Sequence, residues 1–412
     1  MPYAAGWRAS HSIRTADAKV TSIADPFDAG PYSRLQQAIG LLRRGTLRRD
    51  RWTERRRAVI IASIAWIPLV VLSAIQGLAI GETASQSLLF DFGVYSRYLV
   101  AIPILILGER LLLTRLSTIL RTFAGSGFLR QVDQLRFDAL LASTRRWLTH
   151  PIAEVAIVVI AYVATLAING TQYRSDIATW TNTTGDGMGA MSFAGYWRAF
   201  VSQPLYLICV ETWIWRAIVW GRLLWNVAHL DLVLVPAHPD LTAGLLFVSR
   251  SVPAFAPFAF AVGAGVAGGY AESIFFHGRQ TSDFYPIVIL LVMVVLATAI
   301  LPLLPLIRPI RMAAFRASIE YGELASRLGR RFDERWVRDR RSVTKEALAA
   351  PDFSATTDLY SITANALRIR LLPVEFRSVM ILTICTLLPF LPGLVAVLPI
   401  STLLHFGAKL LL

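Results

Sequence analysis

Six stretches of this chain are long and apolar enough to cross a lipid bilayer, and this feature constrains the fold more than any other. A helix needs about twenty apolar residues to span about 30 Å of hydrocarbon. Hydrophobic residues make up 55% of the sequence, whereas soluble domains contain about 45–50%. We therefore predict an all-α protein, a polytopic transmembrane helical bundle. The six spans are Ala58–Ile80, Tyr98–Leu116, Pro151–Ile168, Phe200–Trp225, about Phe247–Phe275 and about Phe284–Ile307.

The C-terminal stretch Phe376–Leu412 is also hydrophobic, but prolines and a glycine interrupt it. Pro389, Pro392 and Gly393 fall near its middle, and proline removes a helical hydrogen-bond donor. We expect a helical hairpin of two short, tightly turned helices here. A re-entrant hairpin is the alternative.

Arginines are distributed unevenly between the connections. They gather before the first span and in 117–149 and 308–377, whereas 81–97, 169–199 and 276–283 carry few. Because cytoplasmic loops are enriched in Lys and Arg, we predict a cytoplasmic N-terminus. Lys19, Lys345 and Lys409 are the only lysines, a composition typical of GC-rich bacteria. We therefore expect a multi-pass protein of the bacterial inner membrane.

The net charge of +14, from 41 basic and 27 acidic residues, predicts contact with anionic lipid headgroups at the cytoplasmic face. Membrane lipids are thus the expected partners. We do not expect nucleic-acid binding, because no basic patch carries the interleaved aromatic residues of a known binding module.

These observations predict a modular order along the chain. We expect a disordered and basic amphipathic N-terminal segment (1–57), a transmembrane hairpin (58–116), cytoplasmic helices (117–150), spans three to six (151–307) with a periplasmic loop (169–199) and a cytoplasmic loop (228–246), a basic helical segment (308–375) and the C-terminal hairpin (376–412). Apolar residues recur at helical spacing in both long cytoplasmic segments. We expect these two segments to pack together as a cap under the membrane.

Ionisable residues inside predicted spans are the first candidates for function, because each is costly in lipid unless it is paired or hydrated. Glu109 and Arg110 interrupt the second span, and Glu211 and Arg216 interrupt the fourth. Helical rise places the two carboxylates at similar depths, so we predict an ion pair of Glu109 with Arg216 or of Glu211 with Arg110. The pair would either lock two helices together or line a pathway for an ion or solute.

The fifth span contains the small-residue stretch "AVGAGVAGGY". Gly265 and Gly269 form a G-x-x-x-G pattern, with Gly268 beside it. Small residues at this spacing allow close contact between membrane helices. We expect helix packing or a homo-oligomer contact at these glycines. A pore wall built on small residues is the alternative.

The loop "LVPAHPDLTAGLLF" joins the fourth and fifth spans. Pro236 and Pro239 are expected to end the preceding helix, and Asp240 to accept hydrogen bonds from the N–H of Thr242 or Ala243 as the fifth span begins. In the functional alternative, His238 and Asp240, with His229, form a proton- or ion-binding cluster at a cytoplasmic gate.

The stretch "RLLWNVAHLDLVLVPAHPDLTAGLLF" resembles a family of uncharacterised multi-pass bacterial inner-membrane proteins with an H-P-D-x-x-x-G-L loop between two spans. Ala243-Gly244-Leu245 stands where that family has a Gly-Gly-Leu-like element. The resemblance implies a topology class and no known activity.

The sequence carries none of the usual hydrolase, P-loop or dinucleotide-binding signatures, and no metal-binding histidine spacing. We therefore expect no cofactor or metal, and transport in preference to catalysis. The leading hypothesis is a channel or secondary transporter for an ion or small solute. The alternatives are a membrane-embedded enzyme or lipid-handling protein with a cytoplasm-facing cavity, and a scaffold or sensor that acts through its cytoplasmic helices.

Overall fold

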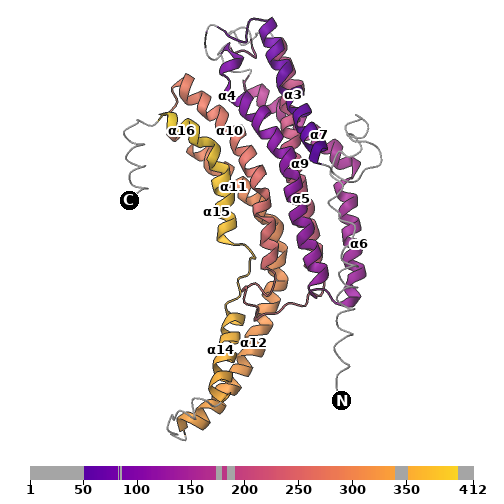
Figure 1. The fold of residues 1–412 in the computed structure, drawn as a ribbon, viewed down its shortest axis with the longest axis vertical. Coiled ribbons are helices and arrows are strands. Elements are labelled where there is room, and N and C mark those ends of the chain that lie inside the picture. The colour runs from indigo at the N-terminus through magenta and orange to yellow at the C-terminus, as the bar shows by residue number, and fades with distance from the viewer. Residues whose placement is uncertain are drawn as a thin grey trace.

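The protein is a bundle of long helices from which a pair of helices projects (Figure 1). The computed structural model describes residues 51–81, 83, 86–172, 179–182, 191–338 and 351–397, and every regular element among them is a helix. The predicted N-terminal segment lies outside these ranges, except for its last residues, which begin the first helix of the bundle.

The first half of the bundle is built from four long helices and a shorter one that lies along the last of them. Helix α5 is entered through a π-helical segment, η3, and α9 through another, η4. The bounds are α3 (Arg51–Ile75), η2 (Leu88–Phe90), α4 (Phe92–Val94), η3 (Tyr95–Ala101), α5 (Ile102–Gly125), α6 (Gln131–Leu148), α7 (Pro151–Gln172), α8 (Phe193–Trp197), η4 (Arg198–Ser202) and α9 (Gln203–Val227).

The second half supplies the most apolar helices and the projecting pair. Their bounds are η5 (Leu246–Ser251), η6 (Pro253–Phe255), α10 (Ala256–His277), η7 (Thr281–Phe284), α11 (Tyr285–Ile300), η8 (Leu301–Leu306), α12 (Ile307–Phe332), η9 (Asp333–Arg338), α14 (Pro351–Leu367), α15 (Phe376–Leu387), η10 (Leu388–Phe390) and α16 (Leu391–Val397). Helices α12 and α14 pack side by side and extend away from the bundle (Figure 1).

Five helical stretches in the described ranges are long and apolar enough to cross a membrane: Glu54–Ile75, Pro151–Asn169, Leu246–Phe276, Thr281–Arg338 and Phe376–Val395. The other two predicted spans, α5 and α9, have the required length. They do not reach the same apolarity, because Glu109, Arg110, Glu211 and Arg216 interrupt them. They nevertheless lie inside the bundle beside the apolar helices (Figure 1).

The predicted turn of a C-terminal hairpin is absent from the described part of the chain. Helix α15 continues through η10 into α16, so Phe376–Val395 is one helical stretch. Pro389 lies inside this stretch, at the start of the 3₁₀ segment η10, where the chain continues as a helix and does not turn back. Gly393 packs against Tyr270 of α10. Residues 398–412 lie outside the described ranges.

The two segments expected to form a joint cytoplasmic cap pack on different partners. Helix α6 lies along α9, whereas α12 pairs with α14 on the other side of the molecule (Figure 1). An aromatic contact holds α6 against α9: Trp147 of α6 stacks on Trp215 of α9 with ring centroids 6.1 Å apart. Arg222 lies 4.3 Å above the centre of the Trp147 ring, a favourable cation–π contact.

The glycines of α10 lie against neighbouring chain. A Cβ on Gly265 would meet the Tyr206 hydroxyl, and one on Gly268 would meet Ser96 and, at 2.6 Å, the Phe92 carbonyl oxygen. A Cβ on Gly269 would lie 3.6 Å from Arg97. These positions let α4 and η3 approach α10 closely, which fits the helix-packing reading of this stretch.

Gly268→Ala is therefore expected to destabilise the bundle by about 1–3 kcal/mol, because the added methyl group forces η3 away from α10. The matched control is Gly322→Ala in α12, where a Cβ meets nothing within 4 Å. The control should be neutral, or stabilising by up to about 1 kcal/mol, through helix propensity. Melting temperatures of both variants in lipid nanodiscs test this, and equal melting temperatures would contradict it.

Candidate functional site

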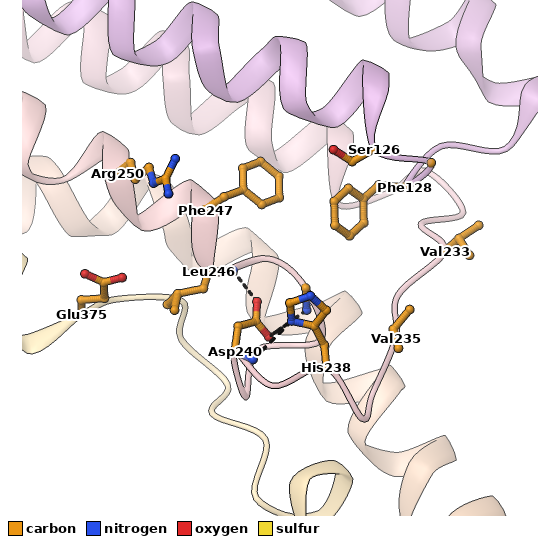
Figure 2. A pocket seen from close by; sticks show the side chains of 12 residues that line it. Ser126, Phe128, Val233, Val235, His238, Asp240, Leu246, Phe247, Arg250 and Glu375 are labelled. Carbon is orange, nitrogen blue, oxygen red and sulfur yellow. Dashed lines mark hydrogen bonds and ion pairs between the residues drawn. The ribbon is translucent and has the colours of Figure 1, made fainter. Parts of the chain in front are cut away.

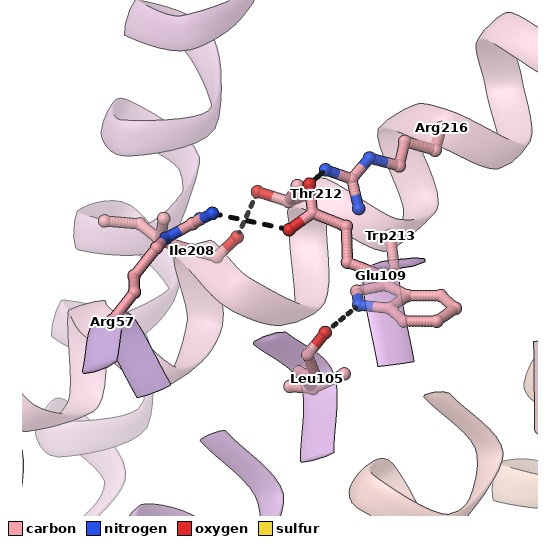
Figure 3. A network of polar contacts seen from close by, with 7 residues as sticks. All are labelled: Arg57, Leu105, Glu109, Ile208, Thr212, Trp213 and Arg216. Carbon is pink, nitrogen blue, oxygen red and sulfur yellow. Dashed lines mark hydrogen bonds and ion pairs between the residues drawn. The ribbon is translucent and has the colours of Figure 1, made fainter. Parts of the chain in front are cut away.

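An ion-pair network joins three helices inside the bundle. Glu109 of α5 pairs with Arg216 of α9, and its other carboxylate oxygen lies 3.5 Å from Nη1 of Arg57 on α3 (Figure 3). The side chains of Glu109 and Arg216 are only 6% and 2% exposed. The structure thus has the first of the two predicted pairs, with Arg57 as an additional member.

The second predicted pair does not form. No ion pair joins Arg110 to Glu211 within the described residues. Nη1 of Arg110 and Oε2 of Glu211 are instead buried atoms that have no hydrogen-bond partner among the described groups. The two residues lie on α5 and α9 next to the Glu109 network in sequence, but their side chains do not meet.

Aromatic side chains fill the bundle beside the network. Trp213 donates its indole N–H to the Leu105 carbonyl oxygen at 3.1 Å (Figure 3), and its ring packs on Phe255 and Phe258. Trp213, Trp220, Phe255 and Phe258 are each at most 1% exposed. The core at this level is therefore packed with side chains.

The ion-pair network of Glu109 lies at one height along the axis of the bundle, and the lengths of the helices on either side of it can be compared. Arg57 lies about 27 Å along α3 from Ile75, a length close to the thickness of the hydrocarbon core. Below this level α5 continues for about 24 Å from Glu109 to Gly125. The apolar helix α7 begins at Pro151, directly after α6 has returned along α9. The lower ends of α5 and α9 thus extend the bundle beyond the length of α3.

Glu109→Gln is expected to lower the free energy of unfolding by about 3–5 kcal/mol, because it leaves the buried Arg216 guanidinium without its carboxylate. The matched control is Glu323→Gln, which breaks an exposed ion pair with Arg327 on α12 and should cost about 0.5 kcal/mol or less. Unfolding of both variants in mixed micelles measures the difference. Equal losses would show that the buried pair does not hold the helices together.

The second site is the loop that follows α9. That helix ends at Val227, well before Pro236, so the prediction that the prolines stop the helix was wrong. The chain leaves the helix early because the loop bonds elsewhere: the Val233 N–H donates to the Phe128 carbonyl oxygen at 2.9 Å. Asp231 pairs with Arg130 at 3.3 Å. These contacts join the loop to the segment that follows α5.

Asp240 organises the loop, although it does not stand at the N-cap of a helix: the next helical segment, η5, begins at Leu246 and its N-cap is Leu245. Its carboxylate accepts the N–H of Thr242 at 2.9 Å, of Gly244 at 3.0 Å and of Leu246 at 3.0 Å. Burial alone would raise the pKa of Asp240. The backbone hydrogen bonds from Thr242, Leu246 and Gly244 outweigh this effect, so the pKa of Asp240 lies below its ordinary value. The bond to Thr242 is as predicted, while Ala243 donates no such bond.

These hydrogen bonds hold a backbone that is otherwise unfavourable. Leu241 and Ala243 have φ angles of +56° and +55°, in a region that residues with a side chain rarely adopt. Gly244 has a φ of +93°, and a Cβ there would lie 2.9 Å from the Phe128 ring. Ala243 therefore holds a left-handed backbone that glycine would adopt without a steric cost.

His238 is brought to Asp240, but His229 is not. Nδ1 of His238 lies 2.9 Å from a carboxylate oxygen of Asp240 and 3.2 Å from the Asp240 backbone nitrogen. Neutral imidazole can accept the N–H at this nitrogen, and the protonated ring can donate to the carboxylate. His229 instead contacts Trp225, with Nδ1 2.7 Å from its carbonyl oxygen. The predicted cluster therefore contains His238 and Asp240 alone.

A pocket of about 550 Å³ opens beside the loop (Figure 2). Its walls come from the end of α5, the loop 228–246 that contains His238-Pro239-Asp240 (the H-P-D loop), η5 and the residue that precedes α15. Sequence reasoning named only His238 and Asp240 of its lining as candidate site residues. The one available signal for another was that Arg250 is the only charged residue between Asp240 and Glu272. The lining residues are Ser126, Gly127, Phe128, Val233, Val235, His238, Asp240, Gly244, Leu246, Phe247, Arg250 and Glu375.

Asp240→Ala is expected to disorder the loop, because three part-buried N–H groups lose their acceptor and the left-handed residues lose their restraint. Hydrogen exchange at Thr242, Gly244 and Leu246 should become at least about tenfold faster. Because the pKa of Asp240 is lower in the folded protein, its contribution to stability is full above about pH 3.9 and is lost as the pH falls through the folded pKa. Asp231→Ala is the control, and equal protection of the three amides in both variants would contradict the prediction.

No protein-family model, curated protein or solved structure matches this chain. The resemblance to multi-pass inner-membrane proteins with an H-P-D loop therefore stays a prediction.

Proposed function

We propose that this protein is a membrane-embedded binding protein that takes a small molecule into the pocket beside the H-P-D loop. The observation that carries the proposal is the pocket, because its volume of about 550 Å³ lies in the range of small-molecule sites. Five helical stretches long and apolar enough to cross a membrane support a membrane location, and the distribution of arginines favours the cytoplasmic side. The proposal follows the expected alternative of a cytoplasm-facing cavity.

The lining of the pocket supports a ligand with an apolar part and a charged group. Phe128 and Phe247 stack with ring centroids 5.5 Å apart and provide an apolar wall with Val233 and Val235. Arg250 supplies a cation on the same pocket, and a guanidinium binds carboxylates and phosphates in a fixed geometry. The loop itself is held by Asp240, so its backbone is organised before a ligand arrives.

A short alkyl carboxylate is the simplest probe of this proposal. Hexanoate is expected to raise the melting temperature of the wild-type protein in nanodiscs, followed by intrinsic tryptophan fluorescence. Arg250→Ala should weaken its apparent affinity by at least about tenfold, because a charge-assisted hydrogen bond contributes about 1.5–3 kcal/mol. The control is Arg279→Ala, at an exposed arginine outside the pocket. A response to hexanoate that is unchanged in Arg250→Ala would contradict the proposal.

Passage of an ion or small solute along α5 and α9 is the second candidate function. The observation that favours it is the pair of buried polar atoms on Arg110 and Glu211, which find no partner among the described groups and which a solute or water could satisfy. Flux of Na⁺, K⁺, H⁺ and Cl⁻ into proteoliposomes tests it. Glu211→Gln should reduce the flux, and the absence of any flux in the wild-type protein would rule out the channel hypothesis for these ions.

A further inference from the structure

Two opposite charges, both on exposed residues, line the pocket. Arg250 comes from η5 and Glu375 stands directly before α15, and both line the pocket. Neither takes part in an ion pair within the described residues. Figure 2 draws the two side chains at the same end of the pocket, with no interaction between them.

The other charged groups in the pocket are already engaged. The Asp240 carboxylate accepts three backbone N–H groups and contacts His238, so it is not available to a ligand cation. Glu375 does not cap the helix that it precedes. The charges left to meet a ligand are therefore one guanidinium and one carboxylate, which together favour a molecule that carries both signs.

The apolar wall lies next to this pair of charges. Phe247 and Leu246 precede Arg250 in the same segment, and Phe128 stacks on Phe247. A ligand with its two charges on Arg250 and Glu375 would place a short apolar chain against these rings.

We propose that the pocket binds a free α-amino acid with an apolar side chain, its carboxylate on Arg250 and its ammonium group on Glu375. This inference rests on the proposed function and names the ligand class of that same site. An α-amino acid carries adjacent opposite charges and one side chain, which matches a charge pair beside an apolar wall. A simple anion would instead meet the like charge of Glu375.

Three probes of equal chain length test the charge requirement. L-Norleucine has both charges, hexanoate lacks the ammonium group, and hexylamine lacks the carboxylate. In phosphatidylcholine nanodiscs at neutral pH, norleucine is expected to bind the wild-type protein at least about tenfold more tightly than either analogue, as measured by the shift in melting temperature with concentration. This comparison needs no variant, so it does not depend on the folding of a mutant.

Variants at position 375 then test whether Glu375 causes the tighter binding of norleucine. In Glu375→Gln the preference for norleucine over hexanoate should disappear, whereas Glu375→Asp should keep part of it. The control Glu323→Gln, at an exposed carboxylate on α12, should keep all of it. Equal binding of norleucine and hexanoate by the wild-type protein, or a preference that survives in Glu375→Gln, would overturn the inference.

The outcomes separate this inference from the proposed function. Binding of hexanoate that requires Arg250 but gains nothing from the ammonium group would keep the binding protein and overturn the amino-acid ligand. Failure of all three probes to bind would overturn both.

Discussion

The ion pair between Glu109 and Arg216 is the contact on which the arrangement of the bundle depends. Removing a carboxylate and a guanidinium from water costs several kcal/mol per ion, and only close pairing offsets that cost. The pair therefore allows one register between α5 and α9, and Arg57 ties α3 to the same level. Both helices run on from this level, so the register also positions the loops at their lower ends. The pocket is made where those loops meet.

Asp240 likewise fixes the local structure through a single carboxylate, here within one loop. One carboxylate satisfies three N–H groups of a loop whose residues at 241 and 243 adopt left-handed backbone angles. Strain of this kind persists only where the surroundings impose it, and it is common at binding sites. The loop is also bonded to the segment after α14, through the Arg370 N–H and the Leu241 carbonyl oxygen at 2.6 Å. Residues from both halves of the chain thus form the pocket and hold the loop beside it.

The sequence predicted the elements well where a single physical signal dominates. Long apolar runs gave α3, α7, α10 and α11, and the bond from Thr242 to Asp240 is confirmed. The end of α9 was misplaced because the residues after Val227 continue an apolar pattern. The prolines misled because the helix passes Pro389 through the short 3₁₀ segment η10 without turning back. Arg250 and Glu375 could not be paired from sequence, since only the packing of α15 along α10 brings them to one pocket.

The longest helical stretch has a mechanical consequence. Thr281–Arg338 is one run of 58 residues that begins with an apolar helix and ends in the projecting pair. The part from Ile307 to Arg338 is about 46 Å long. Pro302 and Pro305 lie in η8, directly before this part. A tilt of about 10° at those prolines would displace the far end by about 8 Å. The length of this helix would therefore amplify any such tilt at the far end of the α12–α14 pair.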